Sequence, residues 1–112
     1  MTKKYRIKAS EGFSEDTTRG NKGAYGELLV CADLLKKGYS VFRAIGPNSP
    51  IDIIALKDGK IEMIDVKSGT KNINGTLAFP KKPGGLIDGA IYVVVVGDEI
   101  HYLFGSDEEN SG

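Results

Sequence analysis

The sequence predicts an α/β fold in which one main helix flanks a central mixed β-sheet. Three observations predict it: a helical stretch rich in Leu and Ala, an Asp-Gly turn between two apolar runs, and a continuous β-branched run near the C-terminus. At 112 residues the chain fits one domain with one hydrophobic core. The formal net charge is zero, so the overall charge gives no sign of a polyanionic partner.

The predicted helix covers residues 24–37. This stretch contains no proline and ends with Lys36 and Lys37 before Gly38. Cations favour the C-terminal end of the helix dipole, and glycine suits the position just beyond the last turn. The preceding residues lack clear periodicity apart from a short strand around residues 5–8, and they form a predicted basic N-terminal arm, residues 1–22.

The middle of the chain predicts three strands. Residues 39–44 and 51–56 carry β-forming side chains and are separated by a Gly/Pro/Asn/Ser loop, residues 46–50. Asp58-Gly59 is a strong hairpin signal and leads into a returning strand, residues 61–67.

The last third predicts a long loop and two more strands. Residues 68–85 are rich in Gly, Lys, Asn and Pro, with one weak apolar patch at residues 77–79 that suits a short strand. Residues 90–96 form a continuous apolar run typical of a strand buried on both faces, and a turn leads to the final strand, residues 99–104.

We expect the folded domain to comprise residues 23–105, followed by a disordered acidic tail, residues 106–112. Cys31 is the only cysteine and His101 the only histidine, which excludes an internal disulfide and a zinc site of Cys and His ligands. A free cysteine fits a reducing, cytoplasmic compartment. The sequence shows no signal-like segment and no apolar run long enough to span a bilayer, so we expect a soluble chain without membrane contact.

Glu27 occupies an unusual place on the predicted helix. On a wheel of about 100° per residue, it falls between Leu34 and Cys31, inside the apolar arc. The wheel assigns the solvated face to Lys36, Asp33 and Lys37. A buried carboxylate needs a cation, hydrogen bonds or a metal. The alternative is that Glu27 lies at an exposed helix start, where an acid favours the dipole.

Three more charged residues lie on the two strands of the hairpin. Asp52 begins the first strand directly after the loop and, taken alone, is better explained as a turn-forming aspartate. In the returning strand, alternation places Asp65 and Lys67 on one face, whereas Ile64 and Val66 lie on the other. Taken alone, this pair is equally well explained as an exposed ion pair.

Together these residues predict metal-dependent hydrolysis of a phosphodiester. The hairpin brings Asp52 close to Asp65, and neighbouring carboxylates are tolerated when a cation lies between them. Oxygen ligands without His or Cys indicate Mg²⁺ or Mn²⁺. Lys67 adds a positive charge beside that metal, where it is able to orient a water or to stabilise charge on a phosphate.

The motif Pro50-Ile51-Asp52, followed by Asp65-Val66-Lys67 and preceded by a helix with Glu27, resembles the signature of the PD-(D/E)xK nuclease superfamily. Within it, residues 23–69 are most similar to the archaeal Holliday-junction resolvases and related small endonucleases. The resemblance implies a restriction-endonuclease-like core and a Mg²⁺-dependent DNA endonuclease, with Mn²⁺ as an alternative ion and branched or junction DNA as a candidate substrate. It also implies a homodimer, because cutting two strands needs two sites.

The resemblance further implies the roles of individual residues. Glu27, Asp52 and Asp65 become catalytic metal ligands together with the backbone carbonyl of Val66, and Lys67 becomes the catalytic lysine. The sequence departs from the family in the Ile51 insertion, in having Asp rather than the commoner Glu at residue 65, and in lacking a clear second helix in residues 68–89. Whether that segment contains a helix stays open, and a loop-replaced core is expected.

Two alternatives remain open. One is an α/β domain without a site whose charges only decorate the surface, and the position of Glu27 in the apolar arc argues against it. A nucleic-acid-binding or assembly module on the same fold would have no catalysis, but such a module is expected to have lost at least one of the four site residues, and all four are present. Two basic runs are expected to contact DNA phosphates without reading sequence, although solvated surface explains them equally well. Their members are Lys3, Lys4, Arg6, Lys8, Lys71, Lys81 and Lys82.

Overall fold

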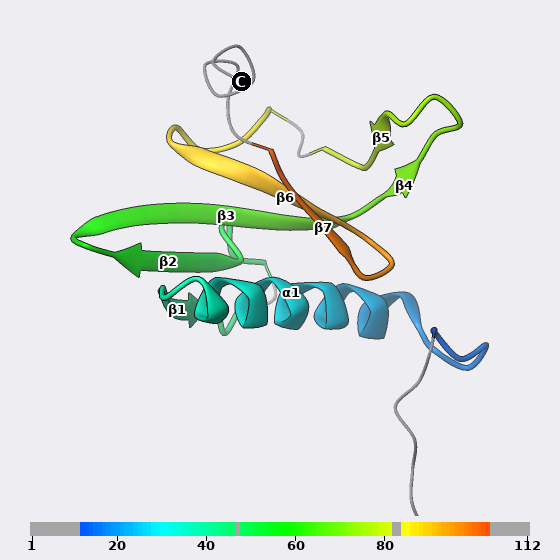
Figure 1. Ribbon diagram of the computed structural model, residues 1–112, viewed down its shortest axis with the longest axis horizontal. Coiled ribbons are helices and arrows are strands. Elements are labelled where there is room, and N and C mark those ends of the chain that lie inside the picture. The colour runs from blue at the N-terminus through cyan, green and yellow to red at the C-terminus, as the bar shows by residue number, and fades with distance from the viewer. Residues whose placement is uncertain (1–11, 47, 82–83, 104–112) are drawn as a thin grey trace, which may run out of the picture.

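The computed structural model describes residues 12–46, 48–81 and 84–103 (Figure 1). Its single helix, α1 (Arg19–Lys36), is followed by seven strands. They are β1 (Ser40–Arg43), β2 (Ile53–Lys57), β3 (Lys60–Ser68), β4 (Thr70–Lys71), β5 (Leu77–Ala78), β6 (Ala90–Val96) and β7 (Glu99–Leu103). The predicted arm strand at residues 5–8 and the acidic tail lie outside the described residues.

Five strands form the central sheet in the order β1-β2-β3-β6-β7. All neighbours are antiparallel except β3 and β6, which run parallel. The predicted mixed sheet is therefore confirmed. Its parallel pair requires a crossover, which residues 69–89 provide.

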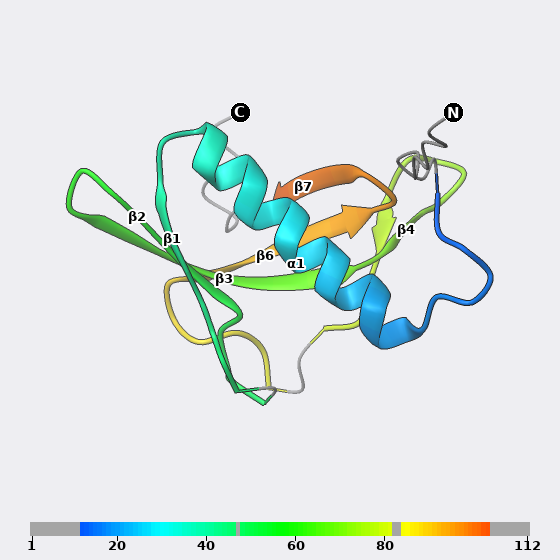
Figure 2. The same cartoon turned by 90° about the horizontal axis from the view of Figure 1, so that it is seen from below.

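Helix α1 lies across one face of this sheet (Figure 2). Its buried residues Val30 and Leu34 pack in a core with Ile53, Ile64 and Val93. β6 is central in the sheet, and its middle residues are buried on both faces, as its unbroken apolar sequence predicts.

The helix begins at Arg19, earlier than the predicted residue 24. The cause is Thr18, whose hydroxyl accepts a hydrogen bond from the Asn21 amide at 3.1 Å and caps the first turn. Helix propensities do not predict this start, because the first residues of the helix include glycines, which have a low propensity.

The helical wheel was right for Lys36 and Lys37, which are exposed, but wrong for Asp33. The Asp33 carboxylate accepts hydrogen bonds from the Lys37 ammonium and from the Tyr102 hydroxyl of β7, so it faces the sheet. Leu28 and Leu35, in contrast, are 53% and 60% exposed. The face that packs on the sheet is thus rotated toward Asp33.

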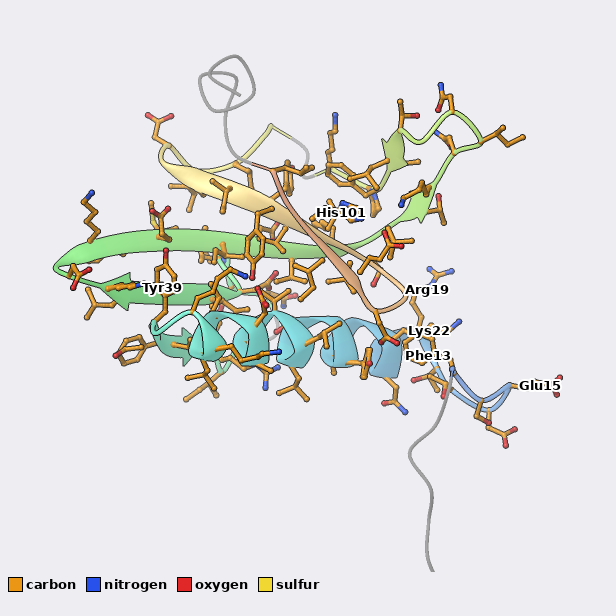
Figure 3. The ribbon with its side chains drawn as sticks, in the orientation of Figure 1. Phe13, Glu15, Arg19, Lys22, Tyr39 and His101 are labelled. Atoms are coloured by element: carbon orange, nitrogen blue, oxygen red, sulfur yellow. The ribbon has the colours of Figure 1, made fainter. Side chains whose placement is uncertain are left out.

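Figure 3 shows Phe13, Arg19 and Lys22 together at the N-terminal end of α1, with Tyr39 near the other end. The ring of Phe13 meets that of Tyr25 edge-on at 5.2 Å between centroids, and the Lys22 ammonium lies 5.5 Å from the Phe13 ring centre. These contacts hold the segment before the helix against its first turns.

The crossover between β3 and β6 contains a small hairpin and no helix in the part that the structure describes, residues 69–81 and 84–89. β4 pairs with β5, and β5 matches the predicted short strand. The expectation of a loop-replaced core is therefore confirmed for those residues. Among the described residues, no helix is long and apolar enough to cross a membrane.

Candidate active site

The candidate site lies beside the first residue of β2. Beyond that point β3 continues without β2 as its neighbour. Ile53 of β2 faces Ile64 of β3, and the Asp52 amide donates to the Ile64 carbonyl at 3.0 Å. Asp52 immediately precedes β2, and Ile53–Ile64 is the last pair of this ladder, so Asp52 lies beside the stretch of β3 that contains Asp65. The pairing then stops, so the edge of β3 is open beside both aspartates.

Asp52 covers part of that open edge. One of its carboxylate oxygens, Oδ2, accepts a hydrogen bond from the Val66 amide at 2.7 Å. In a strand, the amide and the carbonyl of one residue point toward the same neighbour. The carbonyl of Val66 therefore points to the same open edge as its amide.

Asp65 is a buried charge at the floor of the site, with an exposed fraction of 1%. The Lys67 ammonium lies 3.6 Å from its Oδ2, and the lysine side chain is 25% exposed. Ile64 and Val66 pack toward the core on the helix side of the sheet, as strand alternation predicts. The interpretation of this pair as a fully exposed ion pair does not hold, because its acid is buried.

Glu27 reaches the site from α1. Its side chain is 27% exposed, and its Oε1 accepts a hydrogen bond from Arg43 Nη2 at 3.1 Å. The alternative of a free acid at the helix start is therefore wrong, since the helix starts two turns earlier and the acid has a cationic partner.

All four predicted site residues line one pocket. Its walls are Glu27, Asn48, Ser49, Pro50, Asp52, Asp65, Val66 and Lys67. The loop between β1 and β2 supplies one wall, the end of β3 supplies the floor, and α1 supplies the opposite side. The pocket therefore combines three acids with one lysine, next to an open strand edge.

The donor chemistry fits a hard divalent ion. The two aspartates of the pocket, one of them buried, offer carboxylate oxygens near a backbone carbonyl, the ligand type that Mg²⁺ and Mn²⁺ prefer. Among the described residues, however, no three acidic, His or Cys side chains stand close enough together to form a complete metal centre. Glu27 is the member that is held aside, by Arg43.

The predicted phosphate-contacting lysines are described only in part. Lys71 donates to Glu99 at 2.9 Å, and the same carboxylate oxygen lies 3.1 Å from His101 Nε2 (Figure 3). Lys81 lies over the Phe79 ring, 5.5 Å from its centre. The remaining candidates lie outside the described residues: Lys3, Lys4, Arg6, Lys8 and Lys82.

Arg43, Asn48 and Ser49 were missed by the sequence argument. A signal for Arg43 was present, since a partly buried Glu27 calls for a cation, and Arg43 is the one basic residue of β1. Asn48 and Ser49 carried only a loop signal. Cys31 belongs to the core, and burial raises the pKa of its thiol, which keeps it protonated.

Comparison with known proteins shows first the fold of this chain and then its family. The bacterial homing endonuclease I-Ssp6803I has a similar structure, with a TM-score of 0.66 and 20% identity over 85% of this chain and 70% of that chain. This likeness shows that the chain has a restriction-endonuclease-like fold. Residues 17–103 match the family described as PD-(D/E)XK endonuclease, and the chain belongs to that family. No curated protein matches the chain.

Proposed function

We propose that this protein is a Mg²⁺-dependent endonuclease that hydrolyses DNA phosphodiester bonds in the pocket of Glu27, Asp52, Asp65 and Lys67. The single observation that carries the proposal is the buried Asp65 carboxylate, which lines one pocket with Asp52 and lies 3.6 Å from the Lys67 ammonium. Burying a carboxylate at an open strand edge costs folding free energy, and a neutral residue would pack better there.

Each residue has a distinct part in the proposed reaction. Asp52, Asp65 and the Val66 carbonyl would hold the metal ion, with Glu27 as a further ligand. Mn²⁺ suits the same oxygens. A bound divalent ion supplies Lewis-acid polarisation of the phosphate and lowers the pKa of a water. The Val66 amide fixes the orientation of the Asp52 carboxylate, which leaves Oδ1 available for the site.

Lys67 acts on the charge that develops during the reaction. Its ammonium lies at the pocket wall and is held near Asp65 by strand alternation. A fixed cation at this position stabilises negative charge on the phosphate oxygens and orients the attacking water. The low exposure of its partner Asp65 strengthens these electrostatic effects.

We also propose that the protein works as a homodimer, because one pocket cuts one strand and a duplex or a four-way junction has two strands to cut. The affinity for DNA comes from lysines on the crossover and in the N-terminal arm, which contact phosphates.

The proposal is tested by incubating the protein with a panel of branched and linear DNAs in Mg²⁺ or in EDTA. Cleavage should require the metal and should disappear in Asp65→Asn. Glu62→Gln is the matched control, since Glu62 lies on the same strand but outside the pocket, and it should cut normally. DNA binding without any cleavage by the unmutated protein would instead identify a non-enzymatic binding module.

A further inference from the structure

An arginine of the neighbouring strand binds one of the acids that line the site. Arg43 is the last residue of β1, and the next amide, that of Ala44, donates to the Asp52 carbonyl at 2.9 Å. The Arg43 Nη2 donates to Glu27 Oε1 at 3.1 Å, which holds the guanidinium beside the acid of α1. None of the proposed catalytic roles uses this residue.

Among the described residues the three acids do not form one compact ligand group, and Glu27 is the acid that is paired with a guanidinium. Asp52, just before β2, and Asp65, within β3, line the same pocket, whereas Glu27 comes from α1 and is engaged by Arg43. An acid in an ion pair with a guanidinium loses affinity for a cation, because a competing positive charge already holds its oxygen. One of the three proposed acidic ligands is therefore already engaged by a guanidinium.

The pair is also able to open. The side chains of Arg43 and Glu27 are 42% and 27% exposed, and ion pairs with this much water access are weak. A guanidinium matches the geometry of a phosphate with two parallel hydrogen bonds, so DNA competes well for Arg43. Once Arg43 binds phosphate, Glu27 is released toward the two aspartates.

We propose that Arg43 is a positioning residue that makes assembly of the metal site depend on DNA. In the free protein it withholds Glu27, and a DNA phosphate that binds Arg43 frees Glu27 to complete the site. The inference rests on the proposed function of this pocket. Because linkage is reciprocal, DNA should raise the affinity for metal by the same factor by which metal raises the affinity for DNA.

Calorimetric titration of the full-length protein with Mn²⁺ tests this, with and without a short hydrolysis-resistant DNA duplex. For the unmutated protein, the duplex should tighten Mn²⁺ binding roughly tenfold, a typical coupling strength. Arg43→Gln should bind Mn²⁺ roughly tenfold more tightly in the absence of DNA, and the duplex should add little further affinity.

A double-mutant cycle separates release of Glu27 from a general charge effect. In a Glu27→Gln background, Arg43→Gln should no longer improve Mn²⁺ binding. An equal improvement in both backgrounds, or no improvement in either, would overturn the role of Arg43. Failure of the proposed function is recognised separately, because Asp65→Asn would then bind Mn²⁺ as well as the unmutated protein does.

Discussion

Asp33 links the last turns of α1 to the last strand of the sheet. Its carboxylate accepts hydrogen bonds from the Lys37 ammonium and from the Tyr102 hydroxyl. The bond from Lys37, and after it the bond from Tyr102, lower the pKa of the Asp33 carboxyl, whereas burial acts in the opposite direction. Burial and the same contact raise the pKa of Tyr102. The residue that the wheel placed in solvent therefore helps to hold the helix on the sheet.

This contact predicts a pH-dependent stability. Because the folded pKa of Asp33 lies below its unfolded value, its contribution is present at neutral pH and is lost as the pH falls through the folded pKa. Asp33→Asn should lower the free energy of unfolding by about 1 kcal/mol at neutral pH and by much less in acid. Urea unfolding at about pH 7 and about pH 3 measures the difference. A loss of the same size at both values would contradict the assignment, and Asp88→Asn, at an exposed loop position, is the control.

At the scale of single residues, strand alternation was the sequence rule that predicted the most site residues. Alternation and an Asp-Gly hairpin are local rules, and they were sufficient to place Asp52, Asp65 and Lys67 around one pocket. The partner of Glu27 could not be predicted, because the position of Arg43 depends on how β1 joins the sheet below α1. Such long-range pairings leave no periodic trace in the sequence.

At the scale of the elements, the bounds of a helix or strand were predicted well where the local sequence pattern was strong and poorly where it was weak. The bounds of β6 agree with its continuous apolar run, and the predicted hairpin turn has positive φ at both Asp58 and Gly59, 52° and 76°. The start of α1 was missed because the Thr18 cap is followed by glycine-rich residues. β4 has only two residues, too few to show a pattern.

The passage from β3 into the crossover depends on one small residue. A Cβ atom at Gly69 would lie 2.6 Å from Val94 Cγ1 and 2.8 Å from the carbonyl oxygen of Ala78, closer than atoms can approach. Gly69→Ala should therefore destabilise the protein by about 1–3 kcal/mol, because the crossover must shift away from β6.

Chemical denaturation compares this variant with Gly23→Ala. Gly23 lies in α1 with no neighbouring atom within 4 Å of an added Cβ, so alanine there should stabilise by about 0.5–1 kcal/mol. Opposite signs for the two substitutions are the expected result. Equal effects would show that the tight contact at Gly69 is relieved without cost.

At the scale of the whole molecule, the fold class and the family were predictable from the sequence, but the geometry of the crossover was not. Local rules define the helix and the hairpin, and the parallel β3–β6 pair follows from joining them with one long connection. How the β4–β5 hairpin lies depends on interactions with β7, such as that of Lys71 with Glu99.

Binding to DNA should depend steeply on salt if the crossover lysines bind phosphates. Replacing Lys71, Lys81 and Lys82 together with Gln should reduce the slope of log affinity against log salt by about 0.9 for each lysine–phosphate ion pair removed. Fluorescence anisotropy with a labelled duplex measures the slope. Lys60→Gln, at the first residue of β3 next to the β2–β3 turn, should leave it unchanged. A flat titration, or an unaltered slope in the triple variant, would remove these lysines from the interface.

The most direct test of the central claim is single-turnover DNA cleavage in Mg²⁺ by Lys67→Ala. The Lys67 ammonium is the one charge of the pocket with a proposed role in the reaction itself rather than in metal binding. The variant should fold and should bind DNA in Ca²⁺ as the unmutated protein does, yet cut about 10²–10³-fold more slowly. Asp65→Ala should also stop cleavage, but with partial recovery at high Mn²⁺, because its defect is metal affinity. Near-normal cutting by Lys67→Ala would contradict the proposed mechanism and would reduce Lys67 to a structural partner of Asp65.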